Sequence, residues 1–183
     1  MNARGFSLLE ILIVIAIIGI LGAVIVPNIN RSTPRYEREA FIARFNALLQ
    51  YGWQHAMMTR KIHQITVDIS KKMITLLEES DEVDKSGTVY KQIADAVYDT
   101  TIPLPDQIAI KQFFIEGFDM MTKFSRAKSA SVWFYIIPEG MAQDVIINFI
   151  DTNDKRDGQS RQVGLVLNPF TVQLKEYDTF QKP

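Results

Sequence analysis

The feature that most constrains this chain is an uninterrupted apolar run near its N-terminus. Residues 11–26 read ILIVIAIIGILGAVIV and contain no charged or hydrogen-bonding side chain. Counted from Phe6, the segment forms a helix of roughly 31 Å, which matches the hydrocarbon core of a bilayer. A backbone in lipid must satisfy its own hydrogen bonds. We therefore predict that this segment is helical and crosses a membrane once.

A single carboxylate, Glu10, stands at the entrance to the apolar run. Such a group is costly near hydrocarbon unless a positive charge neutralises it. The sequence offers Arg4, and a neighbouring chain would offer its amino terminus if processing created one at Phe6. A cleaved secretory signal does not fit, because its apolar core is shorter and its cleavage site follows that core. Arg4 also predicts that the short N-terminus stays cytoplasmic while the rest of the chain is exported.

The segment Arg4-Gly5-Phe6-Ser7-Leu8-Leu9-Glu10, with the apolar run and Pro27 behind it, resembles the N-terminus of type IV pilins and type II secretion pseudopilins. In that family a prepilin peptidase cleaves after the glycine and the new N-terminal phenylalanine is methylated. The resemblance implies cleavage between Gly5 and Phe6, N-methylation of Phe6, and a role in assembly for Glu10. It further implies a leader at 1–5, a transmembrane and assembly helix at 6–27, and a periplasmic pilin-like domain at 28–183.

The rest of the chain has the pattern of an α+β body. Pro27 removes a backbone donor, so we predict a helix kink there and a bend or break before Pro34. Apolar residues at three- and four-residue spacing predict an amphipathic helix at about 34–60. We then expect a solvated acidic loop at 78–87, a short helix at 91–98, and strands at 65–69, 73–77, 107–114, 132–137, 145–150, 162–167 and 171–174. The fold class is a long N-terminal helix packed on an antiparallel sheet.

Four short motifs in the body resemble the minor pseudopilins of the GspH/FimT kind. They are Ala56-x-x-Thr59-Arg60-Lys61, Leu104-Pro105, the Phe134 to Gly140 stretch and Gly164-Leu165-Val166. The resemblance implies a minor pseudopilin of a type II secretion pseudopilus in the bacterial inner membrane. Its partners would be prepilin peptidase and other pseudopilins or pilins. The alternative is a minor type IV pilin of the FimT kind, acting in pilus biogenesis or DNA uptake.

Charge argues against a nucleic-acid partner. The chain has 20 Lys and Arg residues against 21 Asp and Glu residues, whereas binding to phosphates requires a surplus of cations. The most suggestive basic group interleaves with acids over a short stretch, as Asp151, Asp154, Lys155, Arg156, Asp157 and Arg161. We therefore expect no binding of nucleic acid.

No pattern of catalytic or cofactor-binding residues stands out. The chain has no cysteine, which excludes thiolate nucleophiles and cysteine zinc sites, and it has no phosphate-binding glycine loop. The stretch from Asp151 to Gly158 superficially suggests a calcium loop, but a cation-ligand position holds Lys155 and no glutamate closes the loop. We predict a polar turn there, no metal, no cofactor and no enzymatic activity.

Two sets of side chains are assigned to structural roles. The only histidines, His55 and His63, show no carboxylates at ligand spacing, and we expect them to be structural or solvated. The aromatic residues that could form a binding surface are expected to belong to the core instead; they are Trp53, Trp133, Phe134 and Tyr135.

Overall fold

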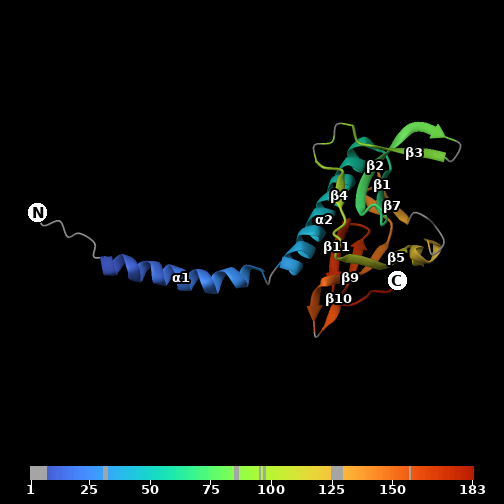
Figure 1. Cartoon of the computed structure of the whole chain (residues 1–183). Coiled ribbons are helices and arrows are strands. Elements are labelled where there is room, and N and C mark those ends of the chain that lie inside the picture. Colours follow the sequence, from blue (N-terminus) through green and yellow to red (C-terminus); the bar gives the residue numbers. More distant parts are fainter. Residues whose placement is uncertain are drawn as a thin grey trace, which may run out of the picture. The chain divides into compact units, whose positions relative to one another are not determined.

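The computed structural model describes residues 8–30, 33–84, 87–94, 96, 98–124, 130–156 and 158–183. It divides into two compact units, Met1–Glu37 and Arg38–Pro183. Figure 1 shows the helical N-terminal part and the β-rich body.

The first unit contains helix α1, Leu8–Asn30, and the start of helix α2, Thr33–Thr59. The chain thus forms two helices whose ends lie between Pro27 and Pro34, where a bend or break is predicted. Pro27 itself lies inside α1, and a kink at this residue stays a prediction. Large apolar side chains described on α1 between Leu8 and Ile20 are exposed.

A membrane span requires both length and apolar character. Within the described residues, no helix meets both requirements.

The described residues of the second unit form two sheets, and the strand pairs among them are antiparallel. The first sheet has the order β3-β2-β1-β7-β8, with β4 also paired to β2. Its strands are β1 His63–Asp68, β2 Met73–Asp84, β3 Gly87–Gln92, β4 Thr101–Pro103, β7 Ser131–Ile137 and β8 Met141–Ala142. The α+β class is confirmed.

The second sheet has the order β11-β10-β9-β5-β6. Its strands are β5 Ile108–Ile115, β6 Phe118–Asp119, β9 Val145–Arg156, β10 Gln159–Asn168 and β11 Gln173–Tyr177. A short 3-10 helix, Met120–Phe124, follows β6. The strands predicted from 107, 132, 145, 162 and 171 onward each correspond to an observed strand.

Helix α2 and both sheets share one hydrophobic core. The helix contributes Phe41, Phe45, Leu48, Leu49 and Ala56, at the three- and four-residue spacing that an amphipathic helix requires. Helix and sheet approach closely at Gly52, where an added Cβ would lie 2.9 Å from Leu76 Cδ1 of β2. The predicted amphipathic helix is therefore confirmed.

The acidic segment and the segment after it differ from prediction. Residues 78–84 continue β2 instead of forming a loop, and β3 begins at Gly87. Lys91 and Gln92 pair with Glu78 and Leu77 as the end of β3, so the helix expected at 91–98 is wrong. Charged side chains are compatible with this hairpin because β3 is an edge strand facing water, and Lys91 Nζ lies 2.6 Å from Glu82 Oε1.

Candidate functional site

The residues assigned to processing and assembly lie at the edge of what the structure describes. Gly5 and Phe6 fall outside the described residues. The backbone of Glu10 and Pro27 belongs to α1, whereas their side chains are not among the parts that the structure describes. Their roles therefore stay predictions. Two polar clusters in the second unit are described in full.

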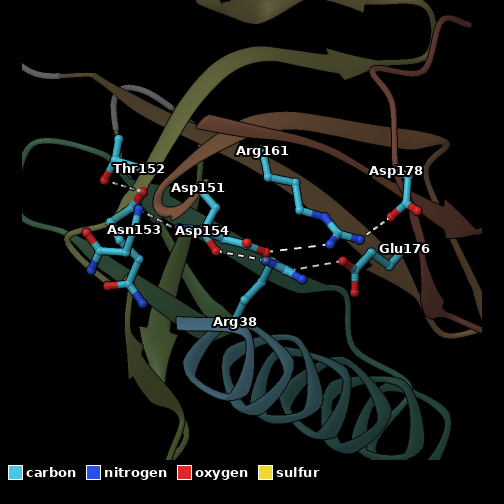
Figure 2. A network of polar contacts seen from close by, with 9 residues as sticks. Arg38, Asp151, Thr152, Asn153, Asp154, Arg161, Glu176 and Asp178 are labelled. Atoms are coloured by element: carbon cyan, nitrogen blue, oxygen red, sulfur yellow. Dashed lines mark hydrogen bonds and ion pairs between the residues drawn. The ribbon is translucent and has the colours of Figure 1, made fainter. Parts of the chain in front are cut away.

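The first cluster surrounds Arg38, near the start of α2 (Figure 2). Arg38 Nη1 donates to Asp151 Oδ2 at 3.0 Å and to Asp154 Oδ2 at 2.6 Å, while Nε donates to Glu176 Oε1 at 3.0 Å. The side chains of Arg38 and Asp151 are 1% and 0% exposed. One guanidinium therefore joins the N-terminal part of α2 to strands β9 and β11.

The positive charge of Arg38 is neutralised by carboxylates of the same chain. Burial alone lowers the pKa of Arg38, but hydrogen bonds to Asp154 and Asp151 and the negative charges of Glu176 and Asp154 outweigh it and raise the pKa. Asp151 Oδ1 also accepts from the backbone N–H groups of Asn153 and Asp154. Arg38 consequently stays protonated and holds its carboxylates in place.

This network corrects the interpretation of the Asp151 to Gly158 stretch as a polar turn. β9 continues to Arg156, and β10 begins at Gln159, so residues 151–156 form a strand instead of a turn. Asp151, which would have been a ligand in a calcium loop, instead binds the guanidinium of Arg38. Arg161 pairs with Asp154 at 3.5 Å and forms a short contact with Asp178. The charge of Arg161 is thus neutralised by carboxylates of this network, which argues against a phosphate-binding role for this arginine.

The second cluster joins the end of α2 to the first hairpin. His55 lies on α2, His63 is the first residue of β1, and Glu78 is its cross-strand partner on β2. His55 Nδ1 lies 2.9 Å from His63 Nε2 and 3.2 Å from Glu78 Oε2, and His63 Nε2 lies 3.6 Å from the same oxygen. The two imidazole nitrogens and the carboxylate oxygen thus lie close to one another.

Hydrogen bonding determines the tautomer of His63. Its Nδ1 lies 3.0 Å from the carbonyl oxygen of Lys61, so Nδ1 carries the proton and donates it. Burial is the main cause that lowers the pKa of this fully buried ring; the Lys61 carbonyl opposes the shift, and His55 adds to it. His63 is therefore neutral at pH 7, and its Nε2 lone pair points towards His55 and Glu78.

The sequence interpretation missed this convergence, although a signal existed. His63 lies two residues before Ile65, so it shares the inward face of β1 with Ile65 and Val67. A hairpin that turns at residues 69–72, and so pairs Asp68 with Met73, also places Glu78 opposite His63. Combining both points would have brought a carboxylate next to a buried histidine.

The aromatic residues divide between core and surface. Phe134 is buried in the core, as predicted, whereas Trp133 is about half exposed. Trp53 packs against the core, and its indole Nε1 donates to the carbonyl oxygen of Gly140 at 2.8 Å. Tyr135 lies against Tyr90, with ring centroids 5.6 Å apart. The core assignment holds for Phe134 and is wrong for Trp133.

Comparison with known proteins finds one family model and one curated relative that match part of this chain. Residues 1–26 match the model of the prokaryotic N-terminal methylation motif. A 50-residue stretch is 44% identical to a type IV wide pilus major component, PilA4, of Thermus thermophilus. That match covers 27% of this chain and 38% of the relative, so the chain spans well under half the length of the curated relative.

Two solved structures of the minor pseudopilin EpsH, from the type 2 secretion system of Vibrio cholerae, also align with this chain. The first has a TM-score of 0.48 and 11% sequence identity, and covers 82% of this chain and 99% of EpsH. The second has the same TM-score and 12% identity, and covers 81% and 95%.

Proposed function

We propose that this chain, which carries the N-terminal methylation motif and belongs to the type IV pilin and type II secretion pseudopilin family, is a structural subunit of a helical filament. The observation that carries the proposal is the motif over residues 1–26. The exposed apolar side chains of α1 support it. A helix that is apolar on all sides must be covered by lipid or by other helices.

Within this family we propose a minor pseudopilin of a type II secretion system. The GspH/FimT-like motifs of the body support this choice. The apolar run would anchor the subunit in the inner membrane, with residues 1–5 in the cytoplasm and the β-rich domain in the periplasm. A minor type IV pilin is the second candidate, and the similarity to a type IV wide pilus major component supports a pilus as the filament.

Glu10 gives the proposed assembly its direction. Its carboxylate would pair with the new amino group of Phe6 on a neighbouring subunit. In an apolar surrounding, a pair of opposite charges is far cheaper than either charge alone. Subunits whose helices are out of register would leave the carboxylate unpaired, so the pair would select one register for each incoming subunit.

Mass spectrometry of the protein from cells with an active prepilin peptidase is expected to show an N-terminus at Phe6. Residues 1–5 should be missing, and the new terminus should carry one additional methyl group. The control is the same chain expressed without the peptidase, which should retain residues 1–5. A chain that keeps Met1 in the presence of the peptidase would refute the proposed processing.

Glu10→Gln is expected to reduce incorporation into the filament at least tenfold, with membrane insertion unchanged. Glutamine keeps the size of the side chain but removes the charge, and a loss of about 1.4 kcal/mol already corresponds to tenfold. Incorporation is measured by co-purification with partner pseudopilins or pilins, whose identity also separates the two candidate filaments. Glu139→Gln, which removes an exposed charge from the body, is the matched control. Normal assembly of Glu10→Gln would disprove the charge-pairing role.

A further inference from the structure

The cluster of His55, His63 and Glu78 has the composition of a transition-metal site. Two imidazole nitrogens and one carboxylate oxygen lie within 4.8 Å of one another, on three different elements of the body. Zinc is commonly bound by histidine and carboxylate ligands of this kind, whereas calcium and magnesium prefer oxygen ligands alone. We propose that this cluster binds Zn²⁺ or a similar divalent transition metal.

Distances within the cluster match those between ligands of one metal ion. Neighbouring ligands of a tetrahedral zinc site, with bonds of about 2.0 Å, lie about 3.3 Å apart. The three separations here are 2.9, 3.2 and 3.6 Å. An ion can therefore contact His55 Nδ1, His63 Nε2 and Glu78 Oε2 with only small side-chain movements.

The groups that hydrogen-bond to or contact the three proposed ligands are also those expected around a metal site. Histidines that bind metals usually donate their other ring N–H to a carbonyl or carboxylate, which orients the ring. His63 does so through Nδ1 to the Lys61 carbonyl. Glu78 directs Oε2 to the histidines, while Oε1 lies 3.5 Å from Lys61 Nζ. Lys61 thus contacts the carboxylate oxygen that the proposed ion would not use.

Solvent can reach the cluster. An open pocket of about 370 Å³ borders on His55 and Glu78, and its other lining residues include Thr59, Lys61 and Asp81. Three protein ligands leave one position of a tetrahedral ion open, and water from the pocket would fill it. His63 is fully buried, whereas His55 and Glu78 are partly exposed and border on the pocket, so the ion would enter from the pocket side.

The competing explanation is a histidine pair held by hydrogen bonds alone. Since Nδ1 of His63 carries its proton, His55 Nδ1–H can donate to His63 Nε2 or to Glu78 Oε2. Metal binding would require the ring proton of His55 to move to Nε2. Both explanations account for the same distances, so a binding measurement decides between them. A bound ion would tie the end of α2 to the β1–β2 hairpin.

The test uses the full chain in detergent, purified with a tag that lacks histidine and freed of metal with a chelator. We expect calorimetric titration with Zn²⁺ to show one saturable site per chain. Co²⁺ should produce the visible absorption of a tetrahedral complex, while Ca²⁺ and Mg²⁺ should bind far more weakly. Zn²⁺ should also raise the thermal midpoint of unfolding, because it binds the folded chain selectively.

Variants assign the binding to these residues. His55→Gln and Glu78→Gln should weaken Zn²⁺ binding at least tenfold and abolish the Co²⁺ absorption. The matched control is Asp81→Asn, which removes a 96% exposed carboxylate from the same pocket and should bind like the original chain. Circular dichroism establishes that each variant is folded. The proposal fails if Zn²⁺ shows no saturable binding, or if a folded His55→Gln variant binds it as tightly as the original chain.

Discussion

Replacing Arg38 with alanine is expected to destabilise the β-rich body by about 3–5 kcal/mol, because removal of one partner leaves a buried charge uncompensated. Asp151 is fully buried and would lose the guanidinium that neutralises it. Asp154 and Glu176 would lose the same partner but are partly exposed and can be hydrated. The largest share of the loss should therefore arise at Asp151.

Urea unfolding of the full chain in mild detergent measures this effect. Both tryptophans, Trp53 and Trp133, belong to the body, so their fluorescence follows its unfolding. Arg44→Ala is the matched control, because Arg44 lies on the same helix and is exposed; its effect should stay within about 0.5 kcal/mol. Equal stability of the Arg38 and Arg44 variants would show that the network does not hold the body together.

A double-mutant cycle shows which interaction accounts for the loss of stability in Arg38→Ala. If it arises from the buried charge of Asp151, then Arg38→Ala should cost much less in an Asp151→Asn background. The two side chains are in direct contact, and contacting residues show coupling of about 0.5–3 kcal/mol. An unchanged cost would instead assign the loss to packing around the arginine stem.

Gly164→Ala is expected to destabilise the body by about 2–3 kcal/mol, although alanine normally suits a strand better than glycine. A Cβ at this position of β10 would lie 2.6 Å from the backbone oxygen of Thr179 and 2.7 Å from Gln181 Cγ. The C-terminal tail would have to move away. Asn148, which is fully buried, would then lose its hydrogen bonds to the backbone of Gln181, at 2.8 and 2.9 Å.

Removal of residues 179–183 provides the control for this prediction. The shortened chain lacks the two tail atoms that the new methyl group would meet, and only the contact with Asn148 Oδ1 at 3.1 Å remains, so Gly164→Ala should there cost much less. The difference between the two backgrounds, from thermal or urea unfolding, measures the contact between tail and strand. An equal loss in both would mean that the tail is not the obstacle.

Most secondary structure could be predicted because its pattern is local. Ile65 and Val67 alternate with polar residues, as in a strand with one buried face. Phe41, Phe45 and Leu48 repeat at helical spacing, so the buried face of each element can be read from its own sequence. The acidic hairpin of β2 and β3 was missed because its side chains are mostly hydrated. Its backbone pairing, such as Glu78 with Lys91, leaves no apolar pattern in the sequence.

The polar clusters were harder to predict for a different reason. Arg38 stands 113 residues before Asp151 and 138 before Glu176, and neither carboxylate differs in sequence from a solvated one. The metal-type cluster is more local, since His55, His63 and Glu78 span a helix end and one hairpin. It could have been found only by combining the strand alternation with the hairpin register.

The sequence by itself determined the apolar run, the position of Glu10 at its entrance, and the resemblance on which the proposed cleavage between Gly5 and Phe6 rests. These features follow from residues adjacent in the chain, where composition and spacing decide the chemistry. Only the tertiary structure decided that Asp151 is a buried partner of Arg38 and that two histidines and Glu78 face one point. Burial and distance between remote residues depend on how the strands pair, and no single segment carries that information.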